Sequence, residues 1–159
     1  MQRTYPNVIN YEGVNGLEQL KWKKQGYDQV TYDLTFPFIR MLAGPVDYTQ
    51  GAMRNATQKG YYPNNHEPMS QGTRCRQLAE YIIFESPFNM LCDTPINYMK
   101  EQECTDFISS VPTIWDETVA LDSKIANYIT IARRSKDTWY IGSINDWKIR
   151  ELEIDLTFL

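Results

Sequence analysis

The chain has 159 residues, of which 42% are hydrophobic and 23% are charged, and its net charge is −4. This length is enough for one compact domain with a buried core, and the acidic balance argues against binding to nucleic acid or to an anionic membrane surface. The three widely spaced cysteines and the single histidine match no disulfide framework and no zinc spacing. The sequence has no run of eighteen apolar residues, so it predicts no transmembrane helix.

Short strands and helices are predicted to alternate from the start of the chain. An apolar run at residues 6–11 predicts a strand, and a helical stretch follows at residues 17–21. A second helical pattern follows Asp33 and ends before Pro45, because proline cannot continue a helix. Residues 46–49 then form a short extended piece.

The clearest helix is predicted at residues 70–86. Its apolar residues recur at the spacing i, i+3, i+4, i+7 and i+8, which gives the helix one apolar face. Ser70 is expected to cap the start, Pro87 to end the helix, and Arg76 to lie on the solvated face. The apolar positions are Cys75, Leu78, Ala79, Ile82 and Ile83.

A further strand is predicted at residues 88–92, followed by a helix that ends near Ile108. Together with the earlier segments this gives three consecutive βα units, which indicate a parallel sheet or part of a barrel. Three such units are too few to close an eight-stranded barrel, which typically needs roughly 250 residues.

The hydrophobic period changes near Pro112, and the rest of the chain reads as an antiparallel meander. Four segments alternate apolar and polar residues with period two, and turn residues separate them; the segments are ETVALDS, NYITIARRS, TWYIGSIND and RELEIDLTF. We therefore predict two parts, residues 1–111 and 112–159. Because the pattern begins inside a βα unit and ends inside a sheet, we expect the chain to be part of a longer protein.

Two acids, Glu12 and Glu18, flank a glycine-bearing turn in the segment EGVNGLE. In parallel βα barrels the functional residues lie at the carboxyl ends of the strands, and Glu12 follows the first predicted strand. Clustered carboxylates serve glycoside hydrolysis, in which one acts as acid and the other as nucleophile or base, and they also bind Ca²⁺. Acids at a helix start equally stabilise the helix dipole without any catalytic role, so the spacing alone leaves these alternatives open.

The same residues carry a resemblance to a known family. Four segments in chain order closely resemble glycoside hydrolase family 97, and together they cover nearly the whole chain: RTYPNVINYEGVNGLEQLKW, FPFIRMLAGPVDYTQGAMRN, EPMSQGTRCRQLAEYIIFESPFNMLCDTPINY and VPTIWDETVALDSKIANYITIARR. That family contains calcium-dependent α-glucosidases and α-galactosidases with a (β/α)8 barrel between two β domains. The resemblance implies an α/β fold, in which residues 1–111 form the C-terminal part of a (β/α)8 TIM barrel and an antiparallel β-sheet domain follows.

The resemblance also implies roles for single residues. Glu18 matches the general acid of the family, and Glu12 matches one of its Ca²⁺-binding glutamates. The base or nucleophile and the other calcium ligands lie upstream in the family, so the chain alone is expected to be inactive. Its partners would then be the remainder of the barrel and the N-terminal domain.

The expected activity is that of an exo-acting α-glucosidase, which hydrolyses terminal α-linked glucose from oligosaccharides. An α-galactosidase of the same family is the alternative, and a non-catalytic carbohydrate-binding β module in the tail is a second one. The resemblance further implies a periplasmic or secreted protein.

Four polar residues near the second predicted strand are candidates for contacts with sugar hydroxyls: Asp47, Tyr48, Gln50 and Arg54. The alternative for the first three is a polar loop that closes the strand, and the alternative for Arg54 is an ion pair with an acid. His66 and Glu67 form either a weak metal pair or part of a loop.

Asp93 is expected either to face the active end of the barrel or to cap the next helix. The three cysteines are expected to be buried thiols. Trp115, Trp139 and Trp147 are expected to pack against the barrel rather than to bind carbohydrate.

Overall fold

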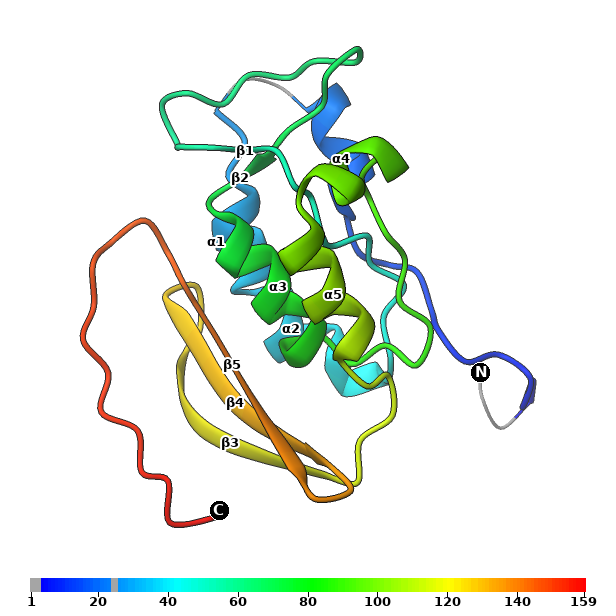
Figure 1. Ribbon diagram of the computed structural model, residues 1–159, viewed down its shortest axis with the longest axis vertical. Coiled ribbons are helices and arrows are strands. Elements are labelled where there is room, and N and C mark those ends of the chain that lie inside the picture. The colour runs from blue at the N-terminus through cyan, green and yellow to red at the C-terminus, as the bar shows by residue number, and fades with distance from the viewer. Residues whose placement is uncertain (1–3, 24–25) are drawn as a thin grey trace.

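The structure is a computed structural model that describes residues 4–23 and 26–159, so Arg3 at the start of the family-like segment lies outside the described residues. A three-stranded sheet packs on one side of helix α3, and helix α5 runs beside α3 (Figure 1). In chain order the elements are the 3₁₀ helix η1 (Leu17–Trp22), α1 (Gln29–Asp33), α2 (Phe36–Ile39), the 3₁₀ helix η2 (Met41–Ala43), β1 (Asn55–Ala56), β2 (Ser70–Gln71), α3 (Arg74–Ile83), α4 (Pro95–Lys100), α5 (Gln102–Ser110), β3 (Glu117–Lys124), β4 (Tyr128–Ser135) and β5 (Thr138–Asn145).

The helices before residue 45 follow the sequence signals closely. The predicted helix at residues 17–21 is confirmed as the 3₁₀ helix η1, and the helical pattern after Asp33 is confirmed as α2 and η2. Gly44 ends η2 with φ +116°, a conformation that costs glycine little. The sequence did not predict α1, which Asp28 caps by accepting a hydrogen bond from Thr31 N at 3.1 Å.

The three strands predicted at residues 6–11, 46–49 and 88–92 are wrong, because none of these segments forms a strand. Their three segments do lie side by side, but the described residues there form one isolated parallel bridge, between Tyr11 and Val46, and a hydrogen bond of 3.2 Å from Cys92 N to Gln50 O. Tyr11 O accepts the backbone hydrogen bond from Asp47 N at 2.9 Å, and Arg40 Nη2 donates to the carbonyl oxygens of Tyr11 and Glu12 as well. The described residues therefore contain no part of a closed (β/α)8 barrel.

Helix α3 is shorter than predicted and begins at Arg74. Its cap is Thr73, whose side chain accepts a hydrogen bond from Arg76 N at 3.2 Å. Ser70 is not the cap, because it belongs to β2 and pairs with Asn55 of β1 in a parallel two-residue sheet. Gly72 separates β2 from the helix with φ +95°, which ends the extended segment.

The buried face of α3 is only partly the predicted apolar face. Ile82 and Ile83 are buried as predicted, whereas Cys75 is exposed. Arg76 and Glu80 are buried as well, so the prediction that Arg76 lies on the solvated face is wrong. The physical reason is an ion-pair network around Arg76, which hydropathy periodicity does not detect.

The predicted helix after residue 94 is two helices, α4 and α5, separated at Glu101 with φ −115° and ψ 53°. Thr94 caps α4 by accepting a hydrogen bond from Asn97 N at 3.4 Å. In residues 4–23 and 26–159 no helix is both long enough and apolar enough to cross a bilayer.

The antiparallel meander is confirmed for three of its four predicted strands, in the order β3-β4-β5. Ser135 pairs with Thr138 across a two-residue loop, and a register shift lies between Ala120 and Asp122. The fourth predicted strand is wrong, because residues 151–159 contain no strand and run past the sheet as an open segment (Figure 1).

The sheet and the helices share one hydrophobic core. Ile129 and Ile144 from the sheet join residues from η1, from α1 and α2 with their flanks, from the segment at 46–52, from the loop between β1 and β2 and from the end of α3. These residues are Leu17, Leu20, Val30, Leu34, Phe36, Val46, Tyr48, Ala52, Tyr61, Ile83 and Phe84. Gly142 allows the close approach, because a Cβ there would lie 2.9 Å from Ile82 Cβ. This core continues across the boundary predicted between residues 111 and 112. The division into two domains stays a prediction about the parent protein.

Candidate functional site

A small pocket of about 90 Å³ lies beside Glu18, and we call it the Glu18 pocket. Its walls come from η1, the segment around Ala52, residues 68–70 and residues 92–93. The elements that form it are therefore far apart in sequence, and the shared core brings them together.

Glu18 stands in the first turn of η1 with an exposed side chain. Thr49 Oγ1 donates a hydrogen bond to Glu18 Oε2, and Glu18 N donates to Thr49 Oγ1 at 3.5 Å. Glu18 Oε1 makes no hydrogen bond within the described part of the chain. One carboxylate oxygen is thus anchored, while the other is free for a ligand.

Glu12, the predicted calcium ligand, is exposed, and its carbonyl oxygen accepts a hydrogen bond from Arg40 Nη2 at 2.7 Å. Within residues 4–23 and 26–159 no three acidic, histidine or cysteine side chains come together as a metal cluster would require. Ca²⁺ takes six to eight oxygen ligands from carboxylates, carbonyl groups and water. Glu12 can supply at most part of a calcium site.

The structure brings neither Tyr48 nor Gln50 into the Glu18 pocket. Both are buried, Tyr48 with 1% and Gln50 with 0% of its surface exposed. Gln50 Nε2 donates to Asn89 Oδ1 at 2.7 Å, whereas Asp47 is half-buried and its backbone N–H donates to Tyr11 O at 2.9 Å. A sugar contact by Tyr48 or Gln50 would require this packing to open, and their predicted roles remain untested.

Arg54 lies 3.7 Å from Glu67 across an ion pair between Nη1 and Oε1. This is the ion pair that the sequence left open as the alternative to a sugar contact. His66 N donates to Asn64 Oδ1 at 2.9 Å, so the loop is shaped by a local turn of the kind that asparagine favours.

Asp93 lines the Glu18 pocket but is fully engaged by its neighbours. Oδ2 accepts from Met53 N at 2.8 Å, and Oδ1 accepts from Thr94 N and Asn97 Nδ2 at 2.7 Å each. Three hydrogen bonds to a carboxylate stabilise and immobilise it, which makes Asp93 a clamp for the start of α4 rather than a reactive group.

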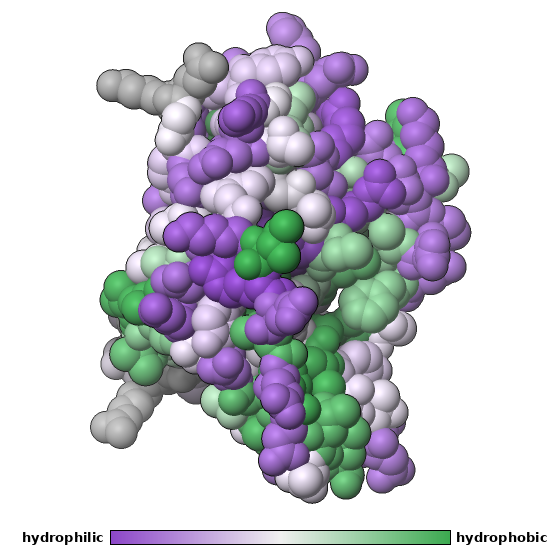
Figure 2. Space-filling model, turned by 90° about the vertical axis from the view of Figure 1, so that its left-hand side faces the viewer, coloured by the Kyte–Doolittle hydropathy of each residue, from purple (hydrophilic) through white to green (hydrophobic). Residues whose placement is uncertain are grey.

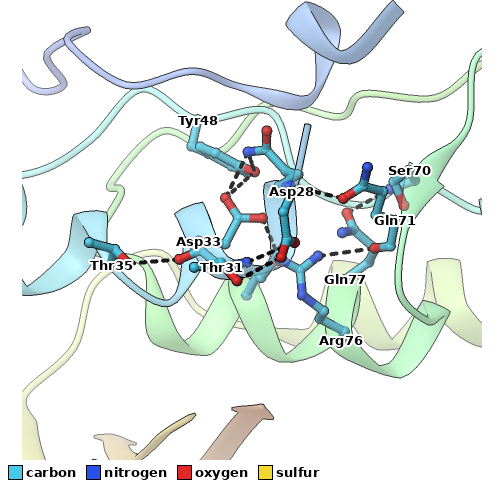
Figure 3. A network of polar contacts seen from close by, with 12 residues as sticks. Asp28, Thr31, Asp33, Thr35, Tyr48, Ser70, Gln71, Arg76 and Gln77 are labelled. Atoms are coloured by element: carbon cyan, nitrogen blue, oxygen red, sulfur yellow. Dashed lines mark hydrogen bonds and ion pairs between the residues drawn. The ribbon is translucent and has the colours of Figure 1, made fainter. Parts of the chain in front are cut away.

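A buried polar network fixes the segment that carries Thr49 (Figure 3). Tyr48 Oη donates to Asp33 Oδ1 at 2.7 Å, and Gln29 Nε2 lies 2.8 Å from each of these two oxygens. Arg76 Nη2 pairs with Asp33 Oδ2 and lies 2.9 Å from Glu80 Oε1. The network joins α1, the segment after Val46 and α3, and the sequence analysis missed it.

The network carries one guanidinium for two carboxylates. Burial raises the pKa of Glu80 to about 8, because Arg76 offsets only part of the desolvation and Asp33 adds repulsion. Burial likewise raises the pKa of Asp33 and that of the Tyr48 hydroxyl well above its usual range. For Arg76, burial opposes the charged form, but Glu80 and Asp33 outweigh it and raise the pKa. Burial with a single guanidinium therefore favours the protonated form of Glu80.

The sequence contained one signal for this network. Gln29 and Asp33 are four residues apart on α1, and Arg76 and Glu80 are four residues apart on α3. Residues with this spacing face the same side of a helix. That the two pairs meet each other is a tertiary contact, which spacing cannot reveal.

The remaining candidates have structural surroundings. Trp147 Nε1 donates to Asp28 Oδ1 at 3.2 Å and the ring packs against the core, while the rings of Trp139 and Phe158 have centroids 4.9 Å apart. Packing against the helical part is thus confirmed for Trp147, whereas Trp139 packs against Phe158 of the C-terminal segment.

The prediction of three buried thiols is wrong for Cys75, which is exposed. Cys92 is half-buried as a residue, and it lines the Glu18 pocket. Burial of the thiol group raises its pKa well above the usual range, with Asp93, Glu80 and Glu18 adding to the effect. A raised pKa keeps a thiol protonated and unreactive.

Comparison with known proteins shows which enzymes the chain is similar to. Over all 159 residues it is 63% identical to the "Retaining alpha-galactosidase" of Bacteroides thetaiotaomicron. The family model described as "Glycosyl-hydrolase 97 C-terminal, oligomerisation" matches residues 114–159. A solved family 97 enzyme from Pseudoalteromonas sp., in complex with panose, superposes on 99% of the chain with a TM-score of 0.84 and 35% identity. The chain is thus similar, over its whole length, to one part of glycoside hydrolase family 97 enzymes.

Family 97 relatives are much longer than the chain. It covers 24% of the Bacteroides protein and 24% of the Pseudoalteromonas enzyme. A "Probable retaining alpha-galactosidase" of Streptomyces bingchenggensis is 29% identical over 142 residues, which are 89% of the chain and 20% of that relative. A structure of a beta-arabinopyranosidase covers 89% of the chain, with a TM-score of 0.72 and 27% identity; the chain spans 22% of that protein.

Proposed function

We propose that the chain is part of a retaining α-galactosidase in which Glu18 is the acid/base residue. The observation that carries the specificity is the 63% identity, over the full chain, to a relative named as a retaining α-galactosidase. The observation that carries the role of Glu18 is its carboxylate at a pocket, with Oε2 anchored by Thr49. The α-glucosidase activity expected from the sequence becomes the second candidate function. It is supported by the similarity to the family 97 enzyme that was solved in complex with panose.

Retaining hydrolysis needs two carboxyl groups about 5 Å apart on either side of the scissile bond. Glu18 gives its proton to the glycosidic oxygen as the bond from that oxygen to the anomeric carbon breaks, and the second carboxylate bonds to that carbon. Glu18 then takes a proton from the water molecule whose oxygen displaces the carboxylate. Three hydrogen bonds bind Asp93 to Met53 and the start of α4, and the family resemblance implies a second carboxylate upstream, so we assign it to the part of the parent protein outside this chain.

The finer fold assignment belongs to the same proposal. We assign residues 1–111 to the end of a (β/α)8 barrel whose other strands lie in the parent protein. The parallel bridge between Tyr11 and Val46 supports it, as does the hydrogen bond from Cys92 N to Gln50 O. Isolated segments of this kind become strands when neighbouring strands extend the ladder. The periplasmic or secreted location inferred from the family stays a prediction.

The proposal is tested in the chain extended to the length of its relatives. The assay measures galactose and glucose released from an α-galactosyl and an α-glucosyl disaccharide. We expect galactose release by the parent protein, and a loss of about 100-fold or more in Glu18→Gln, because general acid catalysis contributes on this order. Glu103→Gln, an exposed acid on α5, is the matched control and should keep full activity. Activity that survives Glu18→Gln would overturn the assignment.

Calcium is proposed as a cofactor of the extended protein, with Glu12 as one ligand. We expect a chelator to abolish galactoside hydrolysis and added Ca²⁺ to restore it. Glu12→Gln should raise the Ca²⁺ concentration needed for half-restoration, because it removes one charged oxygen ligand. Full activity in the chelator-treated protein would exclude the metal from the reaction.

A further inference from the structure

Gly16 lies two residues before Glu18, and its backbone conformation does not require glycine. Its φ is −67° and its ψ is 171°, values that any residue adopts. A side chain at this position would nevertheless have to displace the Glu18 carboxylate and the Thr49 hydroxyl. A Cβ at Gly16 would lie 2.6 Å from Thr49 Oγ1 and closer still to Glu18 Oε2, well inside van der Waals contact. The space over Gly16 is occupied by the hydrogen-bonded carboxylate and hydroxyl.

Thr49 is held in place from both sides along the chain. Its neighbours Tyr48 and Gln50 are among the most deeply buried side chains, with 1% and 0% exposed, and Tyr48 Oη is fixed to Asp33. A β-branched side chain such as threonine also has few χ1 choices. The Thr49 hydroxyl is therefore a rigid donor, whereas the Glu18 side chain to which it donates is exposed and would otherwise sample several rotamers.

We propose that Gly16 and Thr49 are positioning residues for Glu18. Gly16 leaves the space into which the carboxylate folds, and Thr49 anchors Oε2 there, so that Oε1 is the oxygen presented to the glycosidic bond. This inference rests on the proposed function of Glu18 as the acid/base residue. Positioning of this kind matters for rate, because a displacement of about 1 Å can cost on the order of 10²-fold.

The leaving group of the substrate separates a positioning role from a general structural one. A poor leaving group such as an alkoxide needs the proton from Glu18 as the bond breaks, whereas a dinitrophenolate leaves without it. Loss of positioning should thus reduce kcat/KM, which reports the first bond cleavage, for an alkyl galactoside and spare it for dinitrophenyl galactoside. General damage to the fold would reduce both by the same factor.

The experiment compares Thr49→Val, Thr49→Ser, Gly16→Ala and Glu18→Gln in the extended protein, with both galactosides. Thr49→Val keeps the shape but removes the hydroxyl, and we expect a loss of about 10- to 100-fold in kcat/KM for the alkyl galactoside and little loss for the dinitrophenyl one. Thr49→Ser retains the hydroxyl and should restore most of the alkyl activity. Gly16→Ala should behave like Thr49→Val, because the added methyl group displaces the carboxylate.

Glu18→Gln separates failure of this inference from failure of the proposed function. If Glu18→Gln keeps its activity on the alkyl galactoside, the proposed function itself is wrong. If Glu18→Gln loses that activity but Thr49→Val matches the parent protein, or loses equally on both substrates, the positioning role is wrong. Should Gly16→Ala fail to fold, the pair Thr49→Val and Thr49→Ser decides the question alone.

Discussion

At the scale of single residues, the buried network around Arg76 is connected to the candidate site through Tyr48, the neighbour of Thr49. Asp33 and Glu80 are 0% exposed and share one guanidinium. Asp33 in turn accepts the Tyr48 hydroxyl, and Tyr48 precedes the threonine that anchors Glu18. The position of an exposed carboxylate thus depends on an ion pair in the core.

Replacing Arg76 with methionine should destabilise the chain strongly. Arg76→Met leaves two buried carboxylates without a cation, and we expect the free energy of unfolding to fall by about 3–5 kcal/mol. Arg134→Met is the matched control, because Arg134 pairs with Glu117 at 3.2 Å on the surface and such pairs contribute at most about 1 kcal/mol. Urea unfolding followed by circular dichroism measures both. Equal losses would mean that the Arg76 network does not stabilise the fold.

The same network predicts how stability depends on pH. The pKa of Glu80 is raised from 4.5 to about 8, so between these values the folded chain holds a proton that the unfolded chain releases. Stability therefore falls as pH rises from about 5 to 8. Glu80→Gln removes this titration and should flatten the slope, whereas Glu103→Gln should not. Urea unfolding across this pH range is the measurement, and an unchanged slope in Glu80→Gln would contradict the prediction.

At the scale of elements, the sequence predicted those parts whose signals are local. Period-two alternation gave β3, β4 and β5, and proline and glycine marked the ends of α2 and η2. The sequence failed where tertiary contacts decide. The strand expected at Tyr11 is reduced to a single bridge with Val46, and the buried ion pairs of Arg76 reverse its hydropathy-based placement.

The candidate site shows the same division. Glu12 and Glu18 were singled out from their position beside a glycine-bearing turn, and the family resemblance implied their roles. Nothing local pointed to Thr49, which lies 31 residues from Glu18 in sequence. The glycine at position 16 was visible in the sequence, yet its reason is steric and depends on two side chains that only the fold brings together.

The contact between α3 and β5 depends on Gly142. A Cβ at this position would meet Ile82 Cβ at 2.9 Å and Ala79 O at 3.1 Å, so Gly142→Val should force the sheet away from the helix. We expect a loss of about 1–3 kcal/mol, the usual cost of overpacking. Ser123→Ala, at an exposed position of β3, should change stability by less than about 0.5 kcal/mol. Thermal unfolding of both variants tests this, and a Gly142→Val chain as stable as the parent would show that the two elements are free to separate.

At the scale of the whole molecule, the chain leaves many large apolar side chains in contact with solvent. Figure 2 shows apolar residues gathered in the lower part of one face, at the height of the β3–β5 sheet in Figure 1. Helix α4 adds Ile96 and Met99, which are 64% and 74% exposed and three residues apart, so they share one side of the helix. Exposed apolar patches of this kind mark surfaces that bind other protein.

We therefore expect the 159-residue chain to self-associate when it is produced alone, with α4 as one contact surface. A double variant, Ile96→Lys with Met99→Lys, should lower the mass measured by light scattering toward that of a monomer, because it places two charges on the apolar side of the helix. Ser109→Lys with Ser123→Lys adds the same charge at exposed polar positions and should leave the mass unchanged. If both double variants lower the mass equally, charge rather than the apolar side of α4 controls association. A parent chain that is monomeric at all concentrations would mean that the exposed apolar side chains do not drive association.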